Sequence, residues 1–342
     1  MKHVGILVGG SGQEAQVSLC SGKFVFKNFP QDYAKPFFIH IDDSLRFSLH
    51  RDDQFMEGCG NLYHAREDIK TYPMVQLLGE LQNFGIMQEN LLGIFPLVHG
   101  TLGEDGQLLA YLDTLKIPYA GCSASVSMVC FDKVLTKLSL LTSGVEVVPF
   151  IWGTKLTGVE DHPFTNATVF VKPARQGSSI GISRIEAGFD CKEAINKAFQ
   201  YDTKILIEPE IPGRELEVAI LQTKDGWIQS RAGEINSGSH QYYSYEAKYS
   251  PESDATTCIS DLDMAISQAL KEQVQAIIEI LELRGFARLD FFLDANDRLW
   301  FNEVNTLPGF TGISMFPLLM EEEGVEPPDL IQIILEGMTI NG

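Results

Sequence analysis

The amino-acid sequence predicts an α/β protein that begins with a parallel sheet and continues toward the C-terminus in an α+β arrangement. Three observations predict this fold class. Strand-length apolar segments alternate with helix-length segments up to residue 121, as in parallel sheets whose strands are joined by helices. Near the C-terminus, two alternating apolar segments flank a polar turn at 294–297, which indicates an antiparallel hairpin. The length of 342 residues favours two or three domains.

The N-terminal unit is expected to comprise residues 1–121. Each of its strands is a short, buried apolar run, and they are predicted at 4–8, 37–41 and 92–97. Its helices are predicted at 14–26, 74–83 and 107–115. Glycine-rich loops follow the first and third strands, and ligands bind such sheets at the carboxyl ends of the strands.

The central unit is expected at 122–208 and the C-terminal unit at 209–342. Central helices are predicted at 132–142 and 192–200, with strands at 168–172 and 205–208. The C-terminal unit should contain, in order, a strand at 216–221, a long polar loop at 235–251, a helix at 262–283, the hairpin at 286–293 and 298–305, and a helix near 330–337. The long helix has apolar residues every three or four positions, so one of its faces should be buried.

Charge and cysteine content exclude several classes of function. A formal net charge of −20 argues against binding to nucleic acid or to an anionic membrane. None of the six cysteines forms a C-x-x-C pair, so a zinc or redox motif is not expected. The sequence has no apolar run of 18 residues and no signal-peptide pattern, and we expect a cytoplasmic protein with reduced thiols.

The predicted hairpin carries the most informative polar residues. Side chains two apart on a strand share a face, so Arg288 lies beside Asp290, and Glu303 beside Asn305. If the two pairs share one face, two carboxylates and a carboxamide converge there. Such oxygen donors suit Mg²⁺, which also bridges substrate phosphates. The alternative is an ordinary edge hairpin with a solvated polar face.

Placed lysines predict a phosphate site in this acidic chain. A strand ends at Lys172, and the Gly/Ser loop at 175–183 can present backbone N–H groups to a phosphate. Lys133 and Lys248 are further candidate cations, the second in a long loop of the kind that often forms a lid. The extended link at 208–215 can present a carboxylate to an adenine amine. The alternatives are a flexible turn, solvated lysines and a plain interdomain linker.

The first glycine-rich loop has three interpretations. Its sequence, G-S-G-Q-E-A, fits the dinucleotide fingerprint, with Asp42 after the second strand, which favours an NAD(P)-dependent oxidoreductase. A plain strand-to-helix turn is comparably consistent with it. In the third interpretation, the Glu14 carboxylate at the mouth of the loop binds a substrate ammonium group.

Taken in order, the motifs resemble one enzyme family. They are G-G-S-G-Q-E-x-x-V-S-L, H-G-x-x-G-E-D-G, D-K, V-K-P-x-R-x-G-S-S-I-G, I-E, Y-x-A-K-Y, R-x-D and N-E-V-N-T-x-P-G. The set resembles the D-alanine–D-alanine ligases, which are ATP-grasp enzymes, from Gly5 to about Pro317. The resemblance implies a three-domain ATP-grasp architecture with an N-terminal Rossmann-like sheet. It also implies ATP-dependent joining of two D-alanines for peptidoglycan synthesis, two Mg²⁺ ions (or Mn²⁺) and a homodimer.

The resemblance also assigns roles by motif position. Catalytic roles fall on Glu14, Ser178, Tyr249, Arg288 and Gly309, with Glu14 also holding the first substrate's ammonium and Arg288 and Gly309 the oxyanion. ATP contacts fall on Lys133, Lys172, Ser179, Glu208, Ile211, Glu215 and Lys248. The other substrate contacts are His99, Ser314 and Met315, and the metal ligands are Asp290, Glu303 and Asn305.

Three positions depart from the family pattern. Ala15 and Gln16 stand where the family usually has Arg or His followed by Glu, and Pro209 stands where lysine is common. The first two leave room for a sibling ligase with D-serine or D-lactate as second substrate, although Lys248-Tyr249 is typical of the dipeptide-forming enzymes. A catalytically silent ATP-binding protein is a further alternative, which the intact acidic set argues against.

Overall fold

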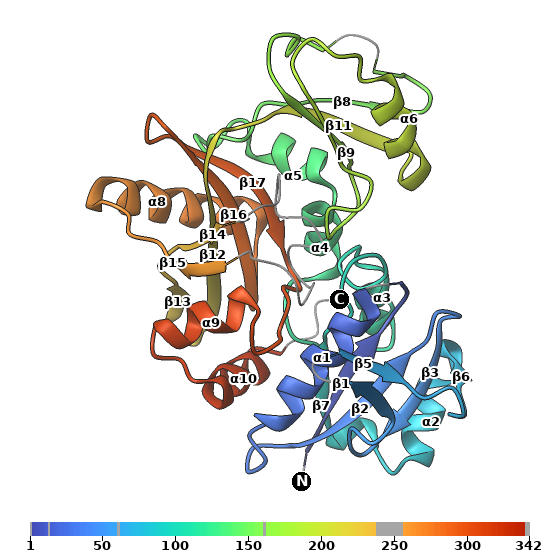
Figure 1. Ribbon diagram of the computed structural model, residues 1–342. Coiled ribbons are helices and arrows are strands. Elements are labelled where there is room, and N and C mark those ends of the chain that lie inside the picture. Colours follow the sequence, from blue (N-terminus) through green and yellow to red (C-terminus); the bar gives the residue numbers. More distant parts are fainter. Residues whose placement is uncertain (1, 13, 60–61, 160–161, 237–255, 339–342) are drawn as a thin grey trace.

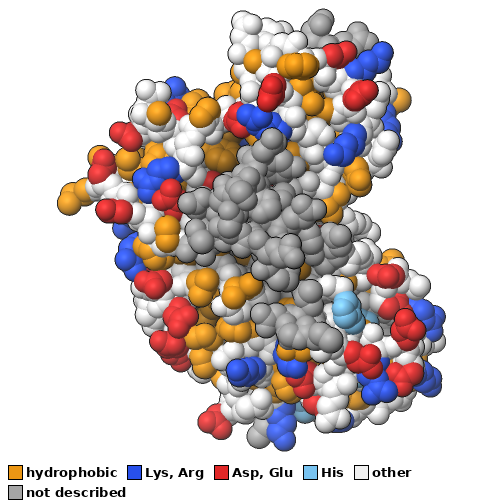
Figure 2. All heavy atoms as spheres, viewed as in Figure 1, with side chains coloured by type: hydrophobic (Ala, Val, Ile, Leu, Met, Phe, Trp, Pro, Cys, Tyr) orange, Lys and Arg blue, Asp and Glu red, His pale blue; other side chains and the backbone are white. Residues whose placement is uncertain are grey.

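The computed structural model describes residues 2–12, 14–59, 62–159, 162–236 and 256–338 (Figure 1). Its larger sheets lie in three successive parts of the chain. No helix in these ranges is long and apolar enough to span a membrane. Lysine, arginine and acidic side chains are intermixed over the described parts of the face shown in Figure 2.

The N-terminal sheet has five strands in the order β6-β3-β2-β1-β7. β1 (His3–Gly9) pairs in parallel with both β2 (Lys35–Ile41) and β7 (Leu91–Pro96), which confirms the parallel sheet expected from the sequence. β3 (Arg46–His50) and β6 (Tyr72–Pro73) extend it in antiparallel fashion and were not predicted. Both are short and lie in a polar stretch, so neither has a strong apolar pattern.

Helices and a small hairpin cover this sheet. The helices are α1 (Glu14–Lys27), α2 (Leu77–Asn83) and α3 (Gln107–Thr114), close to the predicted bounds, with short 3₁₀ turns at Met74–Gln76 and Gln88–Asn90. The hairpin of β4 (Met56–Cys59) and β5 (Leu62–Ala65) packs on α1. Ser18 and Ser21 lie on the buried face of α1, where hydroxyl groups need hydrogen-bond partners.

The central unit has four strands in the order β10-β9-β11-β8, all antiparallel. They are β8 (Ile151–Thr154), β9 (Val169–Pro173), β10 (Ser183–Ile185) and β11 (Lys204–Pro209). Its helices are α4 (Ala124–Phe131), α5 (Lys133–Leu140) and α6 (Lys192–Tyr201). The Asp132 side chain accepts from the backbone N–H groups of Val134 and Leu135, so it ends α4 and begins α5.

The third sheet orders its strands β15-β14-β12-β16-β17, and β13 pairs with β12. The strands are β12 (Gly213–Thr223), β13 (Gly226–Gln229), β14 (Gly233–Asn236), β15 (Thr256–Ile259), β16 (Phe286–Asp294) and β17 (Leu299–Asn305). The helices are α8 (Met264–Leu281), α9 (Met315–Glu322) and α10 (Pro327–Glu336). The loop predicted at 235–251 was wrong at its start, because β14 continues to Asn236; residues 237–251 lie outside the described ranges.

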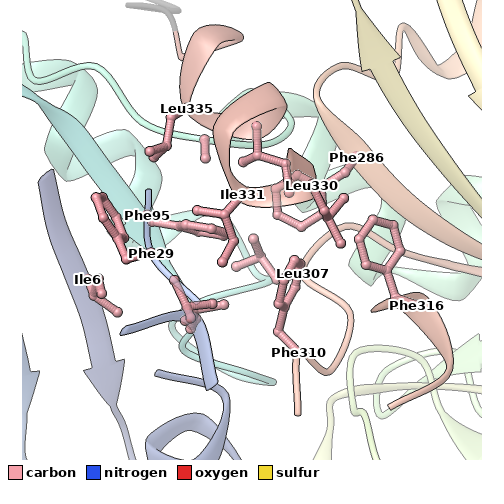
Figure 3. Close-up of a cluster of buried hydrophobic side chains, with 14 of the residues drawn as sticks. Ile6, Phe29, Phe95, Phe286, Leu307, Phe310, Phe316, Leu330, Ile331 and Leu335 are labelled. Carbon is pink, nitrogen blue, oxygen red and sulfur yellow. The ribbon is translucent and has the colours of Figure 1, made fainter. Parts of the chain in front are cut away.

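One buried cluster joins the N-terminal sheet to the C-terminal helices (Figure 3). Phe310 follows β17 and packs against Phe95 of β7 and Phe286 of β16, with ring centroids 5.5 and 6.1 Å apart. Phe316 of α9 and Ile331 of α10 belong to the same cluster. Because buried aromatic side chains pack closely and bury large areas, this cluster holds the chain after β17 against the N-terminal sheet.

Candidate active site

A cavity of about 450 Å³ is lined by residues from all three successive parts of the chain. The lining residues include most of those predicted as site residues, namely Glu14, His99, Lys133, Lys172, Ser178, Ser179, Glu208, Ile211, Glu215, Arg288, Asp290, Glu303, Asn305 and Gly309. Lys248 and Tyr249 lie outside the described residues. Ser314 begins α9, and its hydroxyl pairs with Thr311 Oγ1 at 2.7 Å. The side chain of Met315 is buried in the shared core cluster, so only its backbone remains for the predicted carboxylate contact.

The acidic hairpin forms as the sequence predicted. In the register of β16 and β17, Arg288 lies opposite Asn305 and Asp290 opposite Glu303. A β-bulge follows Asp290, at the end of the polar stretch. The Asn305 amide donates to Asp290 Oδ2 at 3.0 Å, so the predicted donors are close neighbours.

Cations hold both hairpin carboxylates. Arg288 donates to the two oxygens of Asp290 at 2.8 and 2.9 Å, and its Nε lies 3.1 Å from Glu217 Oε2. Lys133 Nζ lies 2.9 Å from Glu303 Oε2. Burial lowers the pKa of Arg288, but Asp290 and Glu217 outweigh it and raise that pKa well above its ordinary value. Glu217, directly opposite Asp290 on β12, was not predicted as a site residue.

The donor set fits a hard divalent cation. Two carboxylates and one amide oxygen lie on neighbouring strand positions at the cavity wall. The described residues contain no group of three or more His, Cys, Asp or Glu arranged for a metal, so a dedicated protein cage is not built there. Mg²⁺ characteristically uses one or two carboxylates and completes its shell with water and substrate phosphates, which suits this smaller set.

The lysine-rich end of the cavity is lined by Lys133, Lys172 and Glu208, and Lys137 lies behind Glu208. Glu208 Oε2 accepts from Lys172 Nζ at 2.6 Å, and its Oε1 lies 2.8 Å from Lys137 Nζ. Burial raises the pKa of Glu208, but the two lysines outweigh it and lower the pKa, so the group is a carboxylate. Lys137 was not predicted; its place on the buried side of α5, three positions after Val134, was the available sequence signal.

The Gly/Ser loop reaches across the cavity. Ser178 and Ser179 have φ angles of 50° and 60°, in the left-handed region that non-glycine residues rarely adopt. Strained backbone of this kind is frequent at ligand sites. The Ser178 hydroxyl donates to Glu14 Oε1 at 2.7 Å, joining residues 164 positions apart. The loop is anchored at its start by the ion pair between Arg175 and Asp202.

The acidic end of the cavity consists of Glu14, Glu104 and His99. Burial, and next the charge of Glu14, raise the pKa of Glu104 to about 8, against an opposing hydrogen bond from Gly100 N at 2.9 Å. Gly100 has φ +65°, which favours glycine, and a Cβ atom there would lie only 1.8 Å from Glu14 Oε2, so the Glu14 carboxylate would have to move. Glu104 was not predicted as a site residue, although it belongs to the quoted H-G-x-x-G-E-D-G motif.

His99 is held by a hydrogen-bonded chain that includes Ser21. Its Nδ1 lies 3.0 Å from the Leu307 carbonyl oxygen, which only accepts, so Nδ1 carries the proton. Burial is the main cause that lowers the pKa of His99 to about 4, so the ring is neutral and Nε2 accepts from Ser21 Oγ at 3.2 Å. Ser21 Oγ in turn accepts from Phe310 N at 3.2 Å. Both ring nitrogens therefore bond to the protein.

Two further expectations bear on specificity. Asp42 accepts from the backbone N–H groups of Ser44 and Arg46, both at 2.9 Å, so it caps its own turn as in a plain loop. This gives no support to the dinucleotide interpretation. From the first turns of α1 the cavity lining has Glu14 and Val17, whereas the Gln16 side chain lies 3.0 Å from His64 Nδ1. The side chain of Gln16, which departs from the family pattern, therefore points toward β5 and is not part of the cavity lining.

Two family models together match most of the chain. One described as the C-terminus of D-ala D-ala ligase matches residues 158–336, and one described as the N-terminus matches residues 3–122. The chain is 34% identical over 357 residues to a D-alanine–D-alanine ligase of Chlorobium phaeovibrioides, covering 97% of this chain and 96% of that protein. It is 33% identical over 352 residues to D-alanine–D-alanine ligase A of Escherichia coli K12, covering 98% and 94%.

Solved structures agree with these relatives. The D-alanine–D-alanine ligase of Coxiella burnetii matches with a TM-score of 0.77 at 25% identity, over 98% of this chain and 95% of that one. The ligase of Bacillus anthracis complexed with ATP matches with a TM-score of 0.75 at 21% identity, over 98% and 97%, and shows likeness of fold alone. The ATP-grasp fold expected from the sequence is confirmed by these similarities.

Proposed function

The chain belongs to the D-alanine–D-alanine ligase family, and we propose that it joins two D-alanines into D-alanyl-D-alanine with conversion of ATP to ADP and phosphate, for peptidoglycan synthesis. The observation that carries the proposal is the cavity with chemically different ends. Lysines at one end suit the phosphates of ATP, and carboxylates at the other suit an ammonium group. Arg288 and Gly309 line the same cavity.

The proposed reaction has two steps. The carboxylate of the first D-alanine attacks the γ-phosphorus of ATP, giving an acylphosphate and ADP. The deprotonated amine of the second D-alanine then attacks the acyl carbon. The bond from that carbon to the phosphate oxygen breaks, phosphate leaves, and the nitrogen loses one proton to give the amide. Lys133 and Lys172 offset charge on the transferring phosphoryl group, as placed cations do in phosphoryl transfer.

Arg288 and the Gly309 N–H are proposed to stabilise the tetrahedral oxyanion of the second step. Preorganised donors of this kind are each worth about 3–4 kcal/mol of transition-state stabilisation. Arg288 is held rigidly by Asp290 and Glu217, which supports a fixed donor. Glu14 is proposed to bind the ammonium of the first D-alanine, with Ser178 and the predicted Tyr249 bracing it. Ser314 and the Met315 backbone are proposed to hold the carboxylate of the second.

The nucleotide and metal roles remain proposals by motif position. Glu208 and the Ile211 backbone are assigned to adenine, Glu215 to ribose, and Ser179 and Lys248 to phosphates. Asp290, Glu303 and Asn305 would hold two Mg²⁺ ions. The bound metal would neutralise phosphate charge and orient the terminal phosphate. The fit of the donor set to Mg²⁺ supports this assignment.

The proposal also includes the domain bounds, the oligomeric state and the cellular location. We propose domains at 1–121, 122–208 and 209–342, supported by one principal sheet in each range, with β11 ending one residue later at Pro209. We propose a homodimer, as the family resemblance implies, which the mass in solution would test. We propose a cytoplasmic location, supported by the free thiols of Cys20, Cys122, Cys130, Cys191 and Cys258 in the described residues.

A substrate panel tests the proposed function. The purified protein with ATP and Mg²⁺ is given D-alanine, L-alanine, or D-alanine together with D-serine or D-lactate, and ADP release and products are measured. We expect ADP release that depends on D-alanine, with D-alanyl-D-alanine as product. Product formed mainly with D-lactate or D-serine would instead establish a sibling ligase. Competition across pH separates these, because an amine acceptor must be deprotonated and a hydroxyl acceptor is not titrated in that range.

A further inference from the structure

Lys137 is a buried lysine for which the proposed function has no role. It lies on α5, one turn after Lys133, and has 0% exposure. Lysines are almost never fully buried unless they are paired. Lys133, Lys172 and Glu208 line the cavity, whereas Lys137 is behind Glu208 and is not part of the lining. Lys137 therefore cannot act by touching a ligand in the cavity.

Glu208 is the group through which Lys137 can act. One carboxylate oxygen faces Lys137 at 2.8 Å and the other faces Lys172 at 2.6 Å. The contact with Lys137 is an ion pair whose angles are not those of a hydrogen bond, and within the described residues neither of its two atoms has a hydrogen-bond partner. Glu208 has 1% exposure, so its orientation depends on these two ammonium groups.

Lys137 changes the balance of charge around Glu208. With both lysines present, two ammonium groups share one carboxylate, and the set has a net charge of +1 that favours a phosphate nearby. Without Lys137, Lys172 would be the single ion-pair partner of this buried carboxylate among the described residues. A phosphate would then compete with Glu208 for Lys172. Lys172 lies on the cavity wall, where a ligand can reach it.

We propose that Lys137 is a positioning residue of the nucleotide site. It holds the Glu208 carboxylate from behind, which leaves Lys172 free to bind a nucleotide phosphate and leaves Glu208 fixed at the cavity wall. The inference rests on the proposed function in that it takes this end of the cavity as the nucleotide site. It predicts an effect on nucleotide affinity that passes entirely through Glu208.

A direct binding measurement tests the proposal. The Kd for ADP is measured by calorimetry, without any amino acid, for the wild type and Lys137→Met, which removes the charge at similar volume. We expect the Kd to rise about tenfold, the scale of one charge-assisted contact. In steady state, KM for ATP should rise while KM for D-alanine stays within about twofold, a split that general loosening of the fold would not produce. An unchanged Kd overturns the proposal.

Lys204→Met is the matched control. Lys204 also pairs with a buried carboxylate, Asp132, at 2.5 Å, and its side chain is 18% exposed. Asp132 caps α5, the helix that carries Lys137, but Lys204 has no contact with Glu208 among its described ion pairs. This variant should lose stability while its Kd for ADP stays near that of the wild type. An equal rise in Kd for both variants would show a general structural effect and overturn the proposal.

A double substitution covers the case in which Lys137→Met folds poorly. Glu208→Gln is compared with Glu208→Gln/Lys137→Met, which leaves no uncompensated carboxylate at this position. Because Lys137 acts only through Glu208, the second substitution should change the Kd for ADP by less than about twofold. A further loss of fivefold or more overturns the proposal. A wild type that binds ADP but shows no D-alanine-dependent turnover would refute the proposed function and leave this inference standing.

Discussion

At the lysine-rich end of the cavity, the buried Glu208 carboxylate lies between two ammonium groups, whereas at the acidic end Glu104 lies beside a second carboxylate. The pKa of Glu208 is lowered and that of Glu104 is raised to about 8. Burial acts in the same direction on both, since desolvation disfavours a charged carboxyl group. The neighbouring charges therefore decide the difference.

The difference corresponds to the ligands proposed for each end. An excess of ammonium groups attracts phosphates, and an excess of carboxylates attracts a substrate ammonium. An ammonium bound between Glu14 and Glu104 would add a positive charge at the acidic end, where the charge of Lys133 lowers the pKa of Glu104 less than burial and Glu14 raise it. Lys133 and Glu303 pair where the two ends meet, and Arg288 stands near them with Asp290 and Glu217. The reacting groups would lie along this middle region.

The largest expected effect is at the middle of the cavity. Arg288→Ala removes the cation shared by Asp290 and Glu217. We expect dipeptide formation to fall by about 10²–10³-fold through the lost oxyanion contact. Unfolding should also become easier by about 3–5 kcal/mol, because two buried carboxylates lose their partner. Steady-state kinetics and denaturant unfolding measure both effects; full activity would refute the oxyanion role.

Arg298→Ala is the control for Arg288. Arg298 is in the turn before β17, and its side chain, 53% exposed, pairs with Glu146 at 2.5 Å. Exposed ion pairs contribute about 0–1 kcal/mol, so activity and stability should stay close to those of the wild type. Arg288→Lys keeps the charge but loses the paired geometry to Asp290, and we expect it to restore stability better than rate.

The next effect in size is at the acidic end. Glu14→Gln keeps a group that can accept from Ser178 but removes the charge. We expect KM for D-alanine to rise about 10–100-fold, the range of one charge-assisted hydrogen bond, with the Kd for ADP unchanged. Opposite results, a weaker ADP complex and an unchanged KM for D-alanine, would show that the two ends have been assigned the wrong way round.

A smaller effect concerns the pH dependence of stability. Because the pKa of Glu104 is raised to about 8, the folded protein binds a proton that the unfolded chain has already lost. Stability should therefore fall as pH rises toward 8, by no more than about 1.4 kcal/mol per pH unit. Between pH 6.5 and 8 this contribution is separable, since His50 and His99, with pKa values lowered to about 4, reduce stability only below pH 6.5.

Glu104→Gln provides the comparison for this pH effect. The amide oxygen can still accept from Gly100 N, but the side chain no longer titrates. Urea midpoints measured from pH 6.5 to 8 should fall for the wild type and stay more nearly level for the variant. The side chain is only partly buried at the cavity wall, so solvent will reduce the slope. Parallel curves for the two proteins would contradict the raised pKa.

The sequence predicted those parts of the site that depend on local order. Arg288 and Asp290 share a strand face because they are two apart, and the turn at 294–297 sets the partner strand. The Gly/Ser loop after β9 and the helix after β1 follow from equally short patterns. In each case the chemistry lies within about ten residues of the signal that reveals it.

Several residues that reach the site through long-range pairing and carry none of the assigned roles were not predicted. Glu217 faces Asp290 only because β12 pairs with β16, and Lys137 reaches Glu208 only because α5 packs behind β11. The Ser21 hydroxyl accepts a hydrogen bond from the backbone N–H of Phe310, which lies 289 positions away in the sequence. Strands β3 and β6, on one side of the N-terminal sheet, were missed for the same reason, because a short strand in a polar stretch is stabilised by its neighbours more than by its own pattern.

The smallest expected effect is at Ser21, which links the acidic end to the oxyanion region. Ser21→Ala removes the hydroxyl between His99 Nε2 and Phe310 N, next to Gly309. Each lost hydrogen bond costs about 1 kcal/mol, so the free energy of unfolding should fall only modestly. Because acylphosphate formation does not use the Gly309 N–H whereas its capture does, more acylphosphate should be lost to water. We therefore expect the ratio of ADP to dipeptide to rise above one, with kcat for dipeptide formation a few-fold lower.

Ser18→Ala is the control, since Ser18 is equally buried on α1 but its hydroxyl accepts from Gly9 N at 2.9 Å instead. The free energy of unfolding of Ser18→Ala should fall by a similar amount, while its ratio of ADP to dipeptide stays at one. The same ratio in both variants would show that Ser21 does not act on the second step.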